Sequence, residues 1–169
     1  TANKNVFEGV VNAGNVINHI ASTVLSAPEI DRRGNQFSLF KYAFTPSVVR
    51  CIRKISEERK QVIEAMGLTV HGNPTGMIDK VLDPEVHVFY EYMDGPNAVN
   101  HRYLHEDCSC GGAFVLSAAG RLGLDMPVLR SFLGVAGAIN DRDYINGGRT
   151  LGNLGFAEGM DMEDIYKEL

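Results

Sequence analysis

Cysteines are few in this sequence and long apolar runs are missing, and each of these features argues against a class of protein. The 169 residues include only three cysteines, Cys51, Cys108 and Cys110, an odd number that provides no framework of paired disulfides. No apolar run approaches the roughly 20 residues that a membrane-spanning helix needs, and no secretory signal pattern opens the chain. We therefore expect a reducing, cytoplasmic setting and no membrane partner.

Positively charged residues are also fewer than negatively charged ones. The sequence has 16 lysines and arginines against 21 aspartates and glutamates, which gives a formal net charge of -5. Proteins whose main partner is nucleic acid or an anionic membrane usually carry a strong basic patch. We therefore predict neither partner, and an anionic ligand would have to be bound by a local cluster of cations.

A glycine-rich dinucleotide-binding motif is missing as well. That motif follows a strand, reads Gly-x-Gly-x-x-Gly, and opens a helix, with an acidic residue about 20 positions later. Gly9 and Gly14 lie in a helix-like pattern, and the glycines between 147 and 155 have no strand ahead of them. We expect no NAD or NADP fold within residues 1–169.

Apolar side chains at helical spacing are abundant instead. Hydrophobic residues make up 44% of the chain, enough for the core of one domain over residues 1–169. Residues 28–44 are expected to form a loop or a short strand pair, because Asp31, Gly34 and Asn35 favour turns. The periodicity predicts an all-α, multi-helix domain, with helices over about 5–27, 46–66, 74–82, 84–92, 111–122, 126–139 and 161–169.

The clearest helix start is at Thr45-Pro46. Thr45 is expected to cap the helix and Pro46 to take its first position, with Gly67 ending it. A charged run in this helix is expected to be its solvated face; it consists of Glu57, Glu58, Arg59 and Lys60.

Two short segments contain the residues that could take part in catalysis or substrate binding. Asn15 and His19 are four residues apart, so a helix places both side chains on one face. A histidine can transfer protons near neutral pH, and Asp107 could orient its ring. Arg102 could bind a substrate carboxylate through two parallel hydrogen bonds. The alternative is that the histidine is structural and that the arginine and aspartate form a surface ion pair.

A metal site is a second interpretation of the later segment. His101, His105, Cys108 and Cys110 place four zinc-type ligands within ten residues. Structural zinc sites usually combine two separated pairs of ligands, and the Cys-x-Cys here lacks a second pair. The metal interpretation therefore has the weaker pattern.

The order and spacing of several motifs resemble the C-terminal domain of the octopine and nopaline (opine) dehydrogenase family. The resemblance covers nearly the whole chain. It runs through the Asn-x-x-x-His of residues 15–19, Phe40 to Arg50, Ile55 to Arg59, Arg102 to Asp107, and Gly148 to Gly155.

The resemblance implies a fold and a set of roles. The fold would be all-α, like the C-terminal domain of 6-phosphogluconate dehydrogenase-like enzymes. His19 would be the catalytic acid/base, Asp107 its partner, and Asn15 a further hydrogen-bonding group in the catalytic set. Arg102 would bind substrate, and we add Thr45 to the expected substrate-binding residues.

The implied reaction joins an amino acid to a 2-oxo acid such as pyruvate and reduces the product with NADH or NADPH. The resemblance places NAD or NADP on a separate N-terminal Rossmann domain, outside this chain, and a homodimer is compatible with it. Two alternatives stay open. One is a sister enzyme that reduces an oxo acid or oxidises a hydroxy acid without an amine partner, and the other is a helical dimerisation domain without catalysis.

Overall fold

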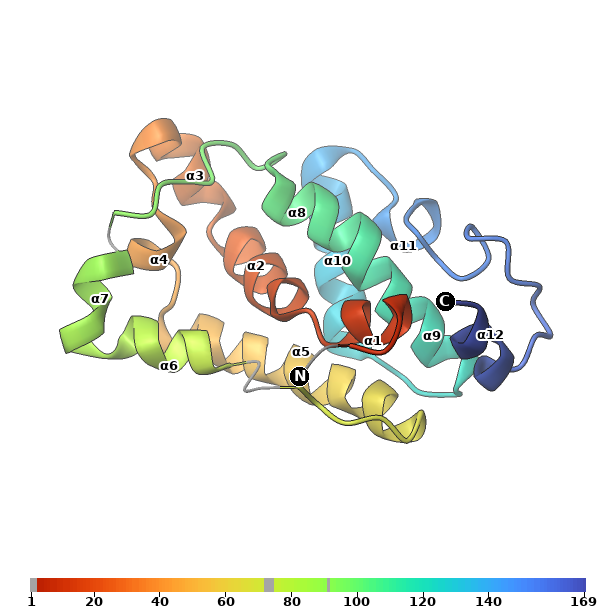
Figure 1. The fold of residues 1–169 in the computed structure, drawn as a ribbon. Helices are drawn as coiled ribbons and strands as arrows, with labels where there is room; N and C mark the ends of the chain where they lie inside the picture. Colours follow the sequence, from red (N-terminus) through yellow and green to blue (C-terminus); the bar gives the residue numbers. More distant parts are fainter. Residues whose placement is uncertain (1–2, 72–74, 91) are drawn as a thin grey trace.

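The protein is a helical domain without a β-sheet in the residues that its structure describes (Figure 1). The structure is a computed structural model, and it describes residues 3–71, 75–90 and 92–169. In these ranges the only strand-like pairing is a single bridge between Ser38 and Gly95. The all-α prediction is confirmed. No helix in this part of the chain combines the length and the apolar character needed to cross a membrane.

The segment predicted as one helix over 5–27 forms two helices, α1 (Val6–Val11) and α2 (Gly14–Leu25). The prediction of a single helix was wrong because the break depends on a distant residue. The Arg59 guanidinium donates through Nη1 to the carbonyl of Ala13, at 2.9 Å, and so binds the backbone at the joint. A local pattern contains no sign of this contact.

The prediction of a loop or strand pair over 28–44 was also wrong. The segment forms α3 (Ala27–Arg33), a short 3-10 helix η1 (Gly34–Gln36) and α4 (Leu39–Tyr42). Pro28 lies in the first turn of α3, where its missing N–H costs nothing and its fixed φ suits a helix. Ser38 caps α4 by accepting a hydrogen bond from the backbone N–H of Lys41.

Helix α5 (Pro46–Ala65) begins at the predicted proline, and Gly67 follows its end with a φ of +65°. Thr45 is its N-cap residue, but its side chain makes no capping hydrogen bond. The prediction of a wholly solvated charged face was wrong at two positions, because Glu58 and Arg59 are 7% and 1% exposed. Both side chains bind backbone groups of neighbouring helices.

Two short helices, α6 (Gly76–Leu82) and α7 (Pro84–Tyr90), follow α5. They agree with the predicted ranges 74–82 and 84–92, although Pro74 and residue 91 lie outside the described residues. α7 packs against both α6 and α4.

The next helical run is longer than predicted. It comprises α8 (Arg102–Glu106), the π-helical segment η2 (Asp107–Gly112) and α9 (Ala113–Arg121). Gly111 and Gly112 were expected to open a helix, but they lie inside the run. A Cβ on Gly111 would be 2.2 Å from Val16 Cγ2, and one on Gly112 would be 2.9 Å from Leu133 Cδ1. The glycines therefore serve close helix packing, which local propensity cannot reveal.

The chain ends in α10 (Pro127–Asn140), α11 (Tyr144–Gly147) and α12 (Met162–Glu168). The Glu58 carboxylate accepts from the backbone N–H groups of Val128 and Leu129 at 2.8 and 2.9 Å. A side chain of α5 thus caps the N-terminus of α10. Asp161 caps α12 as predicted, accepting from the backbone N–H of Glu163.

Helix α2 occupies the centre of the domain. It packs against α5, α8, η2 and α10, and its residues from Val16 to Val24 are all buried. Figure 1 shows α2 between α5 and α8, with α1 beside the C-terminal helix α12. The Val6 N–H donates to the carbonyl of Leu169 at 3.1 Å, which joins the two ends of the described chain. Side chains of α2 that face α8 are therefore held in place by the packing of the surrounding helices.

Candidate functional site

His19 and Asp107, which are 88 residues apart in sequence, form the central pair of the candidate site. His19 lies on α2 and Asp107 begins η2, and the distance from His19 Nδ1 to Asp107 Oδ2 is 2.8 Å. Their side chains are 8% and 18% exposed. A carboxylate in this position fixes the orientation of the ring.

The second ring nitrogen of His19 remains available. In the described part of the chain, Nε2 makes no hydrogen bond, and it is not among the buried polar atoms that lack a partner. It therefore reaches the surface of the site. One nitrogen held by a carboxylate and the other open is the arrangement expected of a proton-transfer group.

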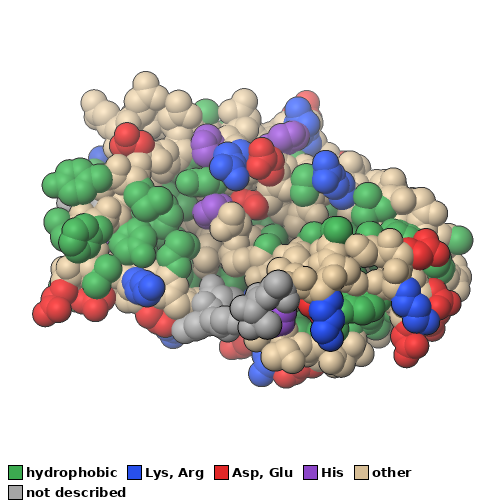
Figure 2. Space-filling view, in the orientation of Figure 1, with side chains coloured by type: hydrophobic (Ala, Val, Ile, Leu, Met, Phe, Trp, Pro, Cys, Tyr) green, Lys and Arg blue, Asp and Glu red, His purple; other side chains and the backbone are tan. Residues whose placement is uncertain are grey.

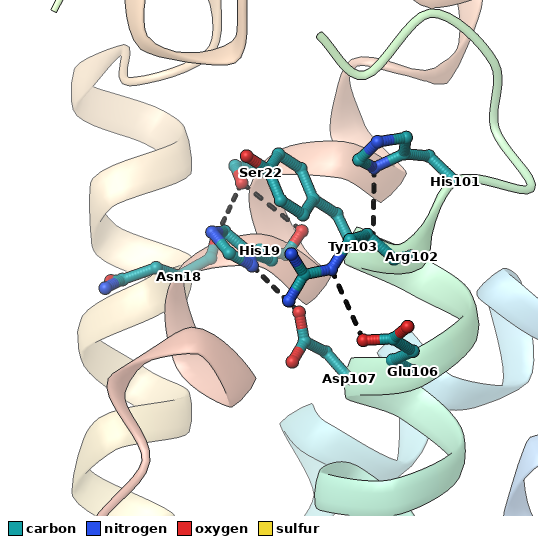
Figure 3. A network of polar contacts seen from close by, with 8 residues as sticks. All are labelled: Asn18, His19, Ser22, His101, Arg102, Tyr103, Glu106 and Asp107. Atoms are coloured by element: carbon teal, nitrogen blue, oxygen red, sulfur yellow. Dashed lines mark hydrogen bonds and ion pairs between the residues drawn. The ribbon is translucent and has the colours of Figure 1, made fainter. Parts of the chain in front are cut away.

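Tyr103 is a site residue that the sequence did not indicate. Its ring stacks on that of His19, with centroids 3.9 Å apart and an angle of 23° between the planes. Figure 3 shows the two rings one above the other, with Asp107 at the edge of the imidazole. His101 in turn contacts Tyr103 edge-on, with centroids 4.6 Å apart. The stack depends on the approach of α8 to α2, so no local motif signals it.

Arg102 lies at the start of α8, beside this pair, and its side chain is 62% exposed. Its Nε is 3.3 Å from Glu106 Oε2, one helical turn away. The surface ion pair considered from the sequence therefore forms with Glu106, while Asp107 binds His19 (Figure 3). Exposed pairs of this kind are weak, so the guanidinium can exchange Glu106 for a substrate carboxylate.

The structure gives the other two predicted residues no side-chain bond to this pair. Asn15 is in the first turn of α2, and its exposed side chain makes no hydrogen bond within the described residues. Thr45 is exposed at the start of α5 and lines a different pocket, of about 430 Å³, together with Phe40 and His87. Within the described residues, no side-chain hydrogen bond or ion pair joins either residue to the His19 and Asp107 pair, so their roles stay predictions.

A pocket of about 660 Å³ lies next to the pair on the α1 side. Asp107 and Glu106 form part of its lining, and the side of α1 and the start of α2 provide aliphatic walls. Arg149, which the sequence did not single out as a site residue, also lines it. We call this space the Asp107 pocket. Its lining comprises Val6, Gly9, Val10, Ala13, Val16, Glu106, Asp107, Cys110, Gly111 and Arg149.

The four candidate zinc ligands do not assemble. Among the described residues no group of three or more histidine, cysteine or acidic side chains is placed to hold a metal ion. Cys108 is fully buried in the core, and burial raises the pKa of its thiol to about 12. Burial, with Arg102 and His19 nearby, lowers the pKa of His101. His101 instead caps α8, accepting from the backbone N–H of Tyr103.

The site lies on one face of the molecule. Figure 2 shows histidine, arginine and acidic side chains gathered over α8 and an apolar area over α4 and α7, with a hollow between them. Exposed apolar side chains of this end include Phe89 and Tyr92, which are 73% and 82% exposed. The polar side chains over α8 and the apolar area over α4 and α7 thus lie on opposite sides of the hollow.

A comparison with known protein families gives a match for residues 2–140. They match the family described as "NAD/NADP octopine/nopaline dehydrogenase, alpha-helical domain". The chain belongs to this family. The resemblance stated from the sequence motifs is therefore confirmed, together with the helical nature of the domain.

The chain is also similar to curated proteins from three bacteria. The chain is 28% identical over 165 residues to the opine dehydrogenase of Arthrobacter sp. (strain 1C), and this match covers 91% of the chain and 45% of the relative. It is 25% identical over 168 residues to the protein ocs of Agrobacterium tumefaciens (strain Ach5), covering 92% and 45%. It is 26% identical over 151 residues to the vitopine synthase of Allorhizobium ampelinum (strain ATCC BAA-846 / DSM 112012 / S4), covering 83% and 41%.

The chain thus spans a little under half the length of these three relatives. The family description names NAD and NADP. The described residues form helices without a sheet, so they contain no strand, glycine-rich turn and helix of the kind that holds a dinucleotide pyrophosphate. The residues present do not fit a complete cofactor site.

Proposed function

We propose that this chain is the catalytic and substrate-binding domain of an NAD(P)H-dependent opine dehydrogenase. The observation that carries the proposal is the His19 and Asp107 pair, in which Asp107 holds Nδ1 while Nε2 is open. The family membership adds the class of chemistry. A buried histidine paired with a partly buried carboxylate on a family-matched domain supports proton transfer better than a purely structural role.

The proposed reaction is the reductive condensation of an amino acid with a 2-oxo acid. The amine nitrogen adds to the 2-oxo carbon, and the carbinolamine then loses its oxygen as water to give an imine. In the complete enzyme, NADH or NADPH would supply the hydride that, together with a proton, reduces the imine to a secondary amine that carries two carboxylates.

His19 supplies the proton that the departing oxygen needs. Protonated His19 donates from Nε2 to the carbonyl or carbinolamine oxygen, and in the reverse direction it accepts that proton. Asp107 keeps Nδ1 hydrogen-bonded and stabilises the imidazolium between these steps. Tyr103, stacked on the ring, limits its rotation.

The remaining predicted residues act on the substrates in this proposal. Arg102 binds a substrate carboxylate in place of Glu106. Asn15 extends from the same helix as His19 and donates to the reacting carbonyl oxygen, and Thr45 contributes a further polar contact to substrate. The proposal assigns NAD or NADP to an N-terminal Rossmann domain of the complete polypeptide, and a homodimer is compatible with it.

The experiment follows NADH and NADPH oxidation by the complete polypeptide that contains this chain. Each of a panel of amino acids is combined with pyruvate or 2-oxoglutarate. Oxidation that requires both partners establishes the proposed reaction. Oxidation with the oxo acid alone would replace it by the sister reductase, and no oxidation with any pair would favour the non-catalytic helical domain.

Replacement of His19 tests the assigned proton transfer. His19→Ala is expected to lower turnover by about a hundredfold or more without unfolding the domain. His71→Ala is the matched control, because His71 contacts Asn3 away from the pair, and it should retain turnover. If His19→Ala kept nearly full activity, the acid/base would have to be another group.

A further inference from the structure

We propose that the Asp107 pocket binds the amino acid substrate, that Arg149 holds its carboxylate, and that its side chain is apolar. This inference rests on the proposed function and deepens it, because the family match does not fix which amino acid or oxo acid this chain binds. It concerns a binding site that the sequence motifs did not indicate.

The charge balance of the reaction calls for a second cation. Both substrates carry a carboxylate, and the product keeps both, whereas Arg102 can bind only one of them at its planar fork. Arg149 is an exposed arginine that lines the pocket beside Asp107. Its guanidinium has no acidic partner within the described residues, where Arg102 is paired with Glu106. It is therefore available to an incoming carboxylate.

A close backbone contact holds the segment that carries Arg149 against η2. The Arg149 N–H donates to the carbonyl of Ser109 in η2, at 2.7 Å. The neighbouring Gly148 is buried, and a Cβ there would lie 2.5 Å from the Ala113 Cβ and 2.7 Å from the Ser109 carbonyl oxygen. Only glycine lets the segment approach η2 this closely. The backbone position of Arg149 beside η2 is thus fixed by packing.

The walls of the pocket favour an apolar side chain. Val6 and Val10 of α1 and Val16 of α2 provide aliphatic surface, and no charged side chain lines that wall. The charged groups, Glu106, Asp107 and Arg149, belong to η2, its border and the segment after α11. An arginine or glutamate side chain laid against Val10 and Val16, which are less exposed than Val6, would lose part of its hydration without a charged partner on that wall.

The arrangement of charges suits an α-amino acid in one orientation. Its carboxylate would bind Arg149, and its amine would face the carboxylates of Glu106 and Asp107, next to His19. Its side chain would then occupy the aliphatic part of the pocket. The volume of about 660 Å³ is that of an ordinary small-molecule site. The amine, which must attack the oxo acid, would thus lie closest to the proton-transfer pair.

The test compares kcat/KM of the complete polypeptide for leucine and phenylalanine with that for arginine and glutamate, at saturating pyruvate and cofactor. We expect the apolar amino acids to be preferred by about tenfold or more, which is the scale of one lost hydration or packing interaction. A preference for arginine or glutamate would overturn the inference and leave the proposed function standing. Absence of turnover with every pair would overturn both.

Arg149→Gln then separates the two carboxylate sites. It is expected to raise KM for leucine by about tenfold and to change KM for pyruvate by less than about twofold. Arg130→Gln, an exposed arginine of α10 outside the pocket, is the matched control and should change neither constant. An unchanged KM for leucine in Arg149→Gln would overturn the assignment of Arg149.

Val6→Glu tests the aliphatic wall without disturbing the core. Val6 lines the pocket but is 58% exposed, so a carboxylate there stays solvated and the domain should fold. We expect the ratio of kcat/KM for lysine over leucine to rise by about tenfold. A ratio equal to that of the unchanged protein would show that the amino acid side chain lies elsewhere and would overturn the inference.

Discussion

The ring of Tyr103 lies nearly parallel to the ring of His19 at a centroid distance of 3.9 Å. This contact joins α8 to α2 directly over the histidine whose Nδ1 binds Asp107. The imidazole is therefore restrained twice, in its plane by the carboxylate and across its face by the phenol ring. Such restraint keeps Nε2 in one direction and is the kind of support that a proton-transfer group requires.

Replacement of Tyr103 measures this support. Tyr103→Leu removes a stacked pair worth about 0.5–1.5 kcal/mol, and we expect kcat to fall by about two- to tenfold. Tyr103→Phe keeps the ring and should keep kcat. The readout is the pair of kcat values and their pH profiles, with KM recorded beside them. Equal losses in both variants would assign the effect to the hydroxyl instead of the stack.

Arg59 provides a prediction about stability. Its guanidinium is buried and binds the Ala13 carbonyl at the joint of α1 and α2, and burial lowers its pKa to about 10. It therefore stays charged at neutral pH. Arg59→Ala leaves a cavity and an unpaired carbonyl, and we expect a loss of about 2–4 kcal/mol in the free energy of unfolding.

Urea unfolding provides the measurement for Arg59. Lys60→Ala is the matched control, because Lys60 is the next residue of α5 and its side chain is 58% exposed; its effect should stay within about 0.5 kcal/mol. Similar unfolding midpoints for the two variants would contradict the structural role of Arg59. Because Ala13 also lines the Asp107 pocket, Arg59→Ala should in addition weaken binding of the amino acid.

Glu58 is expected to stabilise α10 from outside that helix. Its two carboxylate oxygens accept from the N–H groups of Val128 and Leu129. Glu58→Gln replaces one acceptor by a donor and removes the negative charge at a helix N-terminus, so we expect a loss of about 1–2 kcal/mol. Thermal unfolding of this variant beside Glu57→Gln, a change at an exposed position, gives the comparison. Equal unfolding temperatures would show that the cap contributes nothing.

Cys108 should be the least reactive of the three thiols. It is fully buried, and its pKa is raised to about 12, whereas Cys51 and Cys110 are only partly buried. In a titration of the native protein with a disulfide reagent near neutral pH, we expect Cys51 and Cys110 to react first and Cys108 only after unfolding. Rapid reaction of Cys108 in the native protein would contradict its placement in the core.

The same thiol makes stability depend on alkaline pH. The folded protein retains a proton that the unfolded chain releases above the ordinary pKa of 9.0, up to the folded value of about 12. The unfolded state binds fewer protons in this window, so stability falls as pH rises through it. Cys108→Ala should lessen that fall, which urea unfolding at neutral and alkaline pH would detect. An identical fall in both proteins would contradict the raised pKa.

Much of the fold follows from the sequence because helix signals are local. The apolar spacing of α5 and α10, the proline at the first position of each, and the Asp161 cap of α12 are all determined within one or two turns of chain. Two motifs were likewise recognisable in the sequence, one with His19 and one with Arg102 and Asp107. They indicated the family that the comparison shows. These residues show their chemistry by type and spacing alone.

Features that depend on contacts between distant segments of the chain were determined only by the tertiary structure. The break between α1 and α2 requires Arg59, the inclusion of Gly111 in a continuous helical run requires close packing against Val16, and the burial of Glu58 requires α10. The stack of Tyr103 on His19 has the same origin. A sequence specifies propensities within a few residues, whereas the partner of a buried polar group is chosen only when the helices pack.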